Sequence, residues 1–273
     1  RSTSIGYKSL MNQNGGTGNS GNTAVGYATG FENVTGTNNT WVGYQAGIGG
    51  TGSNSNNVGV GLYALAAITT GGSNVVIGME AGDAMTDNSY NTIIGKGAFS
   101  TANQGEDRNI AIGWGAMDSV DAPTSDSNVV IGTLAGQGGA AAMIGCIAIG
   151  DAAMNSTAAN AQTGTIAIGT NALTALTSGA NNLAVGYNSL LGNTTGNRNT
   201  AIGYGAMDGS GGATVLDSDD NVFLGYDSGG GTWTTAVSEF NVGIGNYTLD
   251  GAMNGALNNT AVGYAALSSI TVG

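Results

Sequence analysis

Apolar and small residues recur along the chain in a nine-residue phrase, seen as NTAVGYATG at 22–30 and as NTAVGYAAL at 259–267. Fifteen copies, each with a central glycine, follow one another at spacings of 17 to 22 residues. A period of this kind predicts a stacked array of coils rather than a globular core, so we interpret residues 1–273 as a single repeat domain. The central glycines are Gly6, Gly26, Gly43, Gly61, Gly78, Gly95, Gly113, Gly132, Gly150, Gly169, Gly186, Gly203, Gly225, Gly245 and Gly263.

The residues just before each glycine alternate with a period of two, which is typical of a β-strand and not of a helix. Counting the glycine as zero, positions minus three and minus one are always Thr, Val, Ile or Leu. We expect these two rows to fill the interior of each coil. Position minus two is most often alanine, as in Ala24, Ala111 and Ala184, and we expect it to form a small outer face. The pattern predicts an all-β protein, a parallel β-solenoid of about fifteen coils with one repeat per coil.

Two further positions are nearly constant and have a structural interpretation. Position minus four is Asn in twelve copies, and an amide repeated in register can hydrogen-bond to its copy in the next coil. Position plus three is always Ala, Ser or Thr, and small residues there indicate a tight turn or a second short strand. The variable segments between phrases are rich in Gly, Asn, Ser and Thr and are predicted to be surface turns.

Composition and charge exclude several functional classes. The chain has seventeen acidic residues and only five Lys and Arg, so a surface that binds nucleic acid is not expected. Cys146 is the only cysteine, which excludes a disulfide framework within the chain. No apolar run approaches the ~20 residues of a membrane span, so no membrane insertion is expected. The array begins inside a repeat at Arg1, without a cap, which suggests a segment of a longer fibre.

The phrases at 22–27, 109–113, 199–204 and 259–264 resemble the head repeats of trimeric autotransporter adhesins of the YadA type. They are even more similar to the repeats of bacteriophage tail fibres. The resemblance implies a parallel β-roll, association of three chains, and a rod that presents receptor-binding surfaces. The repeat here is longer than the shorter adhesin repeat, which favours the phage alternative, while neither a stalk and anchor nor a chaperone domain is present to decide between them.

Candidate chemistry is sparse because the chain contains no histidine, which removes Ser-His-Asp, Cys-His and His-metal sites. The densest acidic stretch comprises Asp217, Asp219 and Asp220, which could in principle pair for glycan cleavage or hold calcium through carboxylate oxygens. Asp118, Asp121 and Asp126 form a second acidic group. Neither group has the spacing of a known calcium loop, so we favour solvated acidic loops, with no enzyme activity and no cofactor.

An aromatic residue follows the central glycine in eight copies, and Tyr187, Tyr204 and Tyr226 do so in three consecutive coils. Such rings could stack on the sugars of a receptor, or they could cover a coil edge or a seam between chains. Ice binding is a third alternative, because β-solenoids can display flat threonine arrays. Threonine occupies position minus three only at Thr3, Thr23, Thr40, Thr92, Thr200 and Thr260, which leaves the array interrupted.

These observations favour a structural and adhesive protein. We expect a homotrimeric, extracellular segment of a phage tail fibre on the virion surface, which supports or provides binding to a host cell-surface glycan. The alternative is the head of a bacterial trimeric adhesin on the cell surface. We expect the alanine row at position minus two to be the surface that association buries, because small residues allow backbones to approach closely.

Overall fold

The computed structural model describes residues 1–14, 20–138, 141–156, 161–210, 218–233 and 236–269. Within these ranges the chain forms short β-strands and turns, with one 3-10 turn, η1 (Asp208–Ser210), and no α-helix. None of these segments is a helix of the length and apolarity needed to span a bilayer. The predicted all-β class is therefore confirmed.

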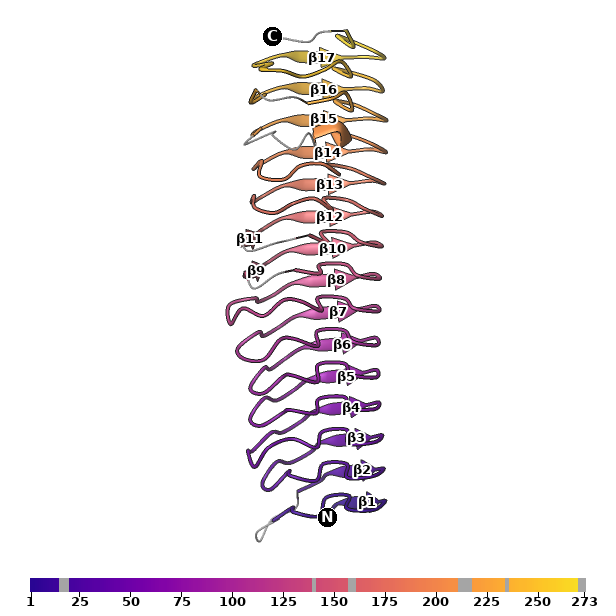
Figure 1. The fold of residues 1–273 in the computed structure, drawn as a ribbon, viewed down its shortest axis with the longest axis vertical. Helices are drawn as coiled ribbons and strands as arrows, with labels where there is room; N and C mark the ends of the chain where they lie inside the picture. The colour runs from indigo at the N-terminus through magenta and orange to yellow at the C-terminus, as the bar shows by residue number, and fades with distance from the viewer. Residues whose placement is uncertain (15–19, 139–140, 157–160, 211–217, 234–235, 270–273) are drawn as a thin grey trace. The chain divides into compact units, whose positions relative to one another are not determined.

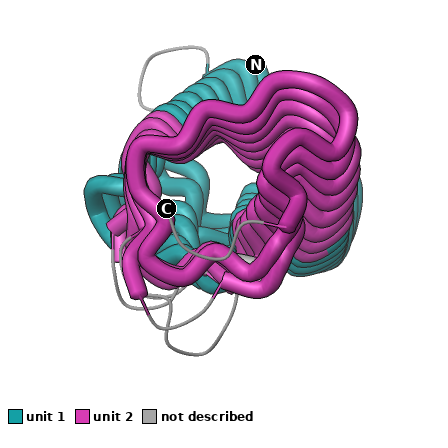
Figure 2. Tube along the Cα trace, turned by 90° about the horizontal axis from the view of Figure 1, so that it is seen from above, with its two compact units in different colours: residues 1–133 teal, residues 134–273 magenta. Residues whose placement is uncertain are grey.

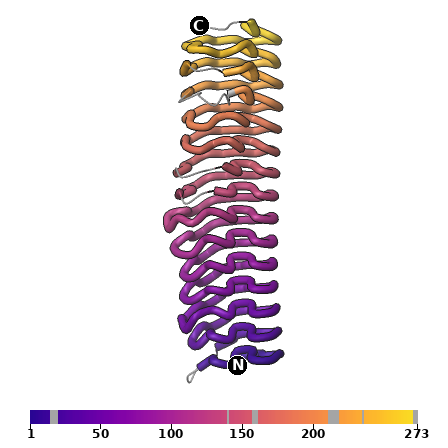
Figure 3. The backbone as a smooth tube through the Cα atoms, viewed as in Figure 1, coloured from indigo at the N-terminus to yellow at the C-terminus, as the bar shows by residue number. Residues whose placement is uncertain are grey.

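The chain divides into two compact units, residues 1–133 and 134–273, and each is a parallel β-solenoid (Figures 1 and 2). In each unit the strands and the turns that follow them are stacked one above the next, while the loops on the other side vary in size (Figure 3). The first unit contains β1 (Thr3–Ile5), β2 (Thr23–Val25), β3 (Thr40–Val42), β4 (Val58–Val60), β5 (Val75–Ile77), β6 (Thr92–Ile94), β7 (Ile110–Ile112) and β8 (Val129–Ile131). The second contains β9 (Met143–Ile144), β10 (Ile147–Ile149), β11 (Gln162–Thr163), β12 (Ile166–Ile168), β13 (Leu183–Val185), β14 (Thr200–Ile202), β15 (Val222–Leu224), β16 (Val242–Ile244) and β17 (Thr260–Val262).

The strands of each unit pair in parallel in chain order, β1 to β8 in the first unit and β10, then β12 to β17, in the second. The register is in phase, so that Val25 lies beside Val42 and Ala184 beside Ala201. A separate pair joins β9 and β11. Each repeat position therefore forms a row along its unit, and the fifteen predicted coils correspond to eight strands in one unit and seven in the other.

The prediction of which strand face points inward is wrong. The residue at position minus two is buried in fourteen of the fifteen strands, and the side chains of Ala111 and Ala184 are 0% exposed. The rows at minus three and minus one point outward, and Ile168 is 37% and Ile202 40% exposed. The alternation correctly placed the two rows on one face of the strand, but it does not show which face points inward. The expectation was wrong because it assumed that the larger residues occupy the interior.

The interior of a coil is filled by position minus two together with position plus four, and in most coils the two volumes are complementary; the pairs Ile93 with Phe99 and Ala24 with Gly30 are exceptions. Trp41 is followed six residues later by Gly47, and Phe223 by Gly229, whereas Ala111 is followed by Met117. A Cβ at Gly47 would lie 2.4 Å from Cδ2 of Trp41, so the glycine makes room for the indole. The small row that suggested an outer face is instead the space that Leu or Met at plus four occupies.

The central glycines are required by close packing of successive coils. Gly95 has φ +142°, and a Cβ there would lie 2.1 Å from the carbonyl oxygen of Gly113. Both the backbone conformation and the approach of the next coil exclude a side chain. After the glycine, residues at plus two and plus four also adopt positive φ, as Ala28 and Leu65 do, and the predicted tight turn at the small plus-three residue is confirmed.

The asparagine row at position minus four forms the predicted ladder. Oδ1 of Asn22 accepts a hydrogen bond from the backbone N–H of Asn39 at 2.8 Å, and Oδ1 of Asn39 does the same for Asn57 at 2.9 Å. Most of the Nδ2 groups donate to a carbonyl of the following coil, as Asn22 does to Gly36 at 2.7 Å. The amide thus satisfies buried backbone groups of its neighbour. Cys146 occupies the same row and is buried, and burial raises the pKa of its thiol.

Candidate functional site

The most extensive candidate surface is the outward side of the strands, which we call the aliphatic face and define as the residues at positions minus three and minus one. Its thirty positions hold six Thr and twenty-four Val, Ile or Leu, and no charged residue. In β12 and β14 these side chains are partly exposed, as Ile168 and Ile202 are. Since the chain carries seventeen acidic residues, the absence of charge from this face in both units is a specific feature of the surface.

The tyrosines that follow the central glycines form stacks, one in each unit. In the first unit the ring centroids of Tyr27 and Tyr44 are 5.0 Å apart with planes 8° apart. In the second unit the corresponding values are 5.0 Å and 14° for Tyr187 and Tyr204, and 5.1 Å and 7° for Tyr204 and Tyr226. The three tyrosines proposed as a receptor site are therefore brought together and are 44% to 51% exposed.

This stacking changes what the tyrosines can bind. The ring of Tyr204 lies between two parallel neighbours, so its faces are shared with them and its edge and hydroxyl remain for solvent. A pyranose can stack on a whole ring face only at the end of such a row, for example on Tyr187, whose preceding neighbour in the row is Thr170. Along the row itself, contact with a glycan would use hydroxyl groups.

Sequence reasoning missed two members of the stacks because they lie at position plus two. Tyr63 meets Tyr44 edge to face at 5.6 Å, and Tyr247 meets Tyr226 edge to face at 5.3 Å. In both coils the residue at plus one, Leu62 or Asn246, is not aromatic. The sequence did contain a signal for them: in these two coils the row at plus one lacks an aromatic residue, and the next residue in the chain is a tyrosine.

The acidic residues singled out as a calcium or catalytic candidate are engaged by an arginine. Nε of Arg198 donates to Oδ1 of Asp220 at 2.7 Å, and its terminal NH2 group lies 3.0 Å from Oδ2 of Asp219. The guanidinium lowers the pKa of Asp220. Asp217 lies outside the described residues. Within the described part of the chain, no three His, Cys, Asp or Glu side chains come together in a way that could hold a metal ion.

The same arrangement recurs in the first unit. The terminal NH2 of Arg108 lies 2.6 Å from Oδ2 of Asp126, which belongs to the following coil. Arg108 and Arg198 both occupy position minus five, and Asp126 and Asp219 both occupy position minus six of the next repeat. Asp118 of the second acidic group accepts a hydrogen bond from Ser100. These carboxylates therefore have partners between coils, which is a structural use of the charge.

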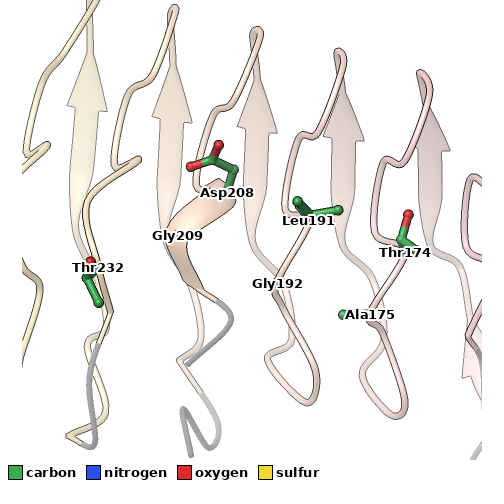
Figure 4. Close-up of a pocket in the computed structure, with 7 residues that line it drawn as sticks. All are labelled: Thr174, Ala175, Leu191, Gly192, Asp208, Gly209 and Thr232. Carbon is green, nitrogen blue, oxygen red and sulfur yellow. The ribbon is translucent and has the colours of Figure 1, made fainter. Parts of the chain in front are cut away.

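A groove of about 470 Å³ crosses four successive coils of the second unit (Figure 4). Among the described residues that line it, the one ionisable side chain is that of Asp208, whose pKa is raised to about 6 by burial and by the carboxylate of Asp227. Hydroxyl groups, glycine backbone and small apolar side chains supply the rest of the lining. The lining residues are Thr174, Ala175, Leu191, Gly192, Asp208, Gly209 and Thr232.

Comparison with known proteins adds no relative, because no protein-family model, curated protein or solved structure matches the chain.

Proposed function

We propose that the chain is a structural and adhesive fibre segment that works as a homotrimer. The observation that carries this proposal is the aliphatic face, which forms an uninterrupted, uncharged strip on each unit. In the first unit eight strands at about 4.8 Å spacing make this strip roughly 35 Å long. Soluble monomers rarely expose a long continuous apolar strip, and burial against other copies would remove this one from water.

A second copy of the chain fits this face better than a foreign partner does. The face has the same two rows in every coil, so an identical surface can align against it coil by coil. The charged residues lie at other repeat positions, which keeps the three net charges of minus twelve away from the contact. The number of three chains rests on the resemblance to tail fibres and trimeric adhesins. A phage tail fibre on the virion remains our first choice, and a bacterial adhesin head the alternative.

The adhesive part of the proposal rests on the tyrosine stack of Tyr187, Tyr204 and Tyr226, which offers hydroxyl groups at regular intervals and begins at Tyr187, next to the non-aromatic Thr170. Replacing all three by Ala should weaken adsorption of the protein to cells or to a glycan array without loss of the β-solenoid circular dichroism spectrum. Tyr90→Ala is the control, since Tyr90 is 65% exposed and belongs to neither stack. Unchanged adsorption of the triple variant would remove these tyrosines from the receptor site.

Ice binding is a second candidate because the structure places the threonines at position minus three outward. Thr3, Thr23 and Thr40 lie side by side in three consecutive strands, which gives one short regular array. Aliphatic residues interrupt the row elsewhere. A thermal-hysteresis measurement separates the two functions, since the fibre proposal expects no hysteresis at micromolar protein.

A further inference from the structure

A small pocket lies beside the tyrosine stack of the first unit. It has a volume of about 120 Å³ and is lined by Lys8, Tyr27, Ala28, Phe31, Gln45 and Ile48. Three of these residues, Lys8, Ala28 and Gln45, occupy position plus two in consecutive coils. Backbone hydrogen bonds from Ala28 to Tyr7 and from Gln45 to Tyr27 hold the three coils in register at 2.8 and 2.9 Å.

The pocket exists because the middle residue of this row is small. Ala28 leaves a gap one coil high between the longer side chains of Lys8 and Gln45. Phe31 and Ile48, both at position plus five, form its apolar wall, and the ring of Tyr27 borders it. The Cα atoms of Lys8 and Gln45 are two coils apart, about 10 Å at the usual strand spacing, which matches the span of one sugar ring with its substituents.

Lys8 gives the pocket a charge that is rare in this protein. It is one of five basic residues in a chain of net charge minus twelve. Among the described residues, the ion pairs involve Arg108 and Arg198, and Lys8 is in none of them. Its ammonium group lies instead 5.5 Å from the ring centroid of Tyr7 and 5.7 Å from that of Phe31. Aromatic rings orient the cation beside the pocket without neutralising it.

We propose that this pocket binds a carboxylated sugar, such as a hexuronate unit of an acidic polysaccharide. The carboxylate would pair with the ammonium of Lys8, and the amide of Gln45 would bond hydroxyl groups at the far end. The apolar side of the sugar ring would lie against Phe31 and Ile48, while Tyr27, whose faces are stacked on Tyr7 and Tyr44, would offer its edge and hydroxyl group. This inference rests on the glycan-binding part of the proposed function and names the class of sugar that the first unit selects.

The test is calorimetric titration of the whole chain with oligogalacturonate and with its methyl ester, which is neutral. The acid should bind at least tenfold more tightly than the ester. Lys8→Gln should abolish that preference, whereas Lys96→Gln, which changes the net charge equally but is not part of the pocket, should preserve it. Ala28→Leu should weaken binding of both the acid and the ester, because the larger side chain fills the gap. The backbone conformation of this position accepts leucine, since Leu134 occupies position plus two in its own coil with φ +51°.

Equal weakening by Lys8→Gln and Lys96→Gln would reveal a net-charge effect and overturn the inference. Equal affinity for acid and ester, or no binding of oligogalacturonate at millimolar concentration, would overturn it as well. If a glycan array then shows that the protein binds neutral glycans, the proposed adhesive function stands and only the carboxylate pocket fails. If the protein binds no glycan at all, both fail together.

Discussion

The central glycines have two constraints, a positive φ and the carbonyl of the next coil, and these can be separated by substitution. Gly95→Ala violates both constraints, since its φ is +142° and its Cβ would lie 2.1 Å from the oxygen of Gly113. Gly97→Ala violates only the first constraint, because its φ is +60° and nothing lies within 4 Å of a Cβ there. We expect Gly97→Ala to lower the free energy of unfolding by about 1 kcal/mol and Gly95→Ala by about 3 kcal/mol or more. Chemical denaturation of the two variants measures the difference, and equal effects would contradict the packing argument.

Glu106 is the buried acid with the clearest pH dependence. Its side chain is 0% exposed, Oε2 accepts a hydrogen bond from Asn88, and Oε1 has no partner. Burial raises its pKa to about 7. Because the folded state holds this proton more tightly than the unfolded state, the stabilisation is complete below about pH 4.5 and is lost as the pH rises through 7.

Glu106→Gln should therefore be more stable than the wild type at pH 8.5, by about 2 to 3 kcal/mol. Its stability should also fall less than that of the wild type between pH 5 and 8.5, the remaining fall coming from groups such as Asp208, whose pKa is raised as well. Thermal unfolding of both proteins at the two pH values measures this. Glu32→Gln is the control, since Glu32 is partly exposed. A wild-type stability that is flat across this range would show that Glu106 is not a buried, protonated acid.

At the scale of one coil, the complementary volumes at positions minus two and plus four make a specific prediction. Trp41→Ala should leave a cavity and lower the free energy of unfolding by about 3 to 5 kcal/mol. Gly47→Leu alone should also destabilise, because its side chain would collide with the indole. The double variant should be more stable than either single variant, since it restores the common pairing of a small residue with Leu, as in Gly59 and Leu65. Additive losses in a double-mutant cycle would refute the pairing.

The sequence predicted the elements well and their orientation badly, for a physical reason. Period-two alternation identifies which residues share a strand face, but both faces of these strands are apolar, so the pattern has no polar side to mark the outside. The distinguishing information was the relation between residues six apart, such as Trp41 with Gly47, which only makes sense if both fill one interior. The asparagine ladder was predictable because an amide in register has one obvious partner, its copy in the next coil.

The candidate sites show the same limit. The tyrosine row was visible in the sequence, but the stacking that covers the ring faces is a three-dimensional property of in-phase coils. Asp219 and Asp220 read as a possible ion site because their partner, Arg198, lies 21 to 22 residues earlier and comes close only through the coil. The pocket at Lys8 likewise joins residues from three coils.

For the whole molecule, the inverted faces move the proposed interface from the alanine row to the aliphatic face. A charge at Ala184 would now be placed inside a coil and should unfold the second unit, whereas a charge at its neighbour Val185 should be tolerated by the coil and disrupt contact between chains. The two substitutions are one residue apart in β13, so they differ in orientation and little else. Circular dichroism of Ala184→Asp and Val185→Asp should show lost β-structure only for the first.

The most direct test of the account is sedimentation equilibrium of the whole chain at micromolar concentration, for the wild type and for a variant with Asp at Val185, Ile202 and Leu224. These three residues are neighbours on the aliphatic face. We predict a wild-type mass three times the 26.7 kDa of one chain and a folded monomer for the variant. A wild-type protein that is a stable, folded monomer would contradict the claim that this face joins the chains of a fibre.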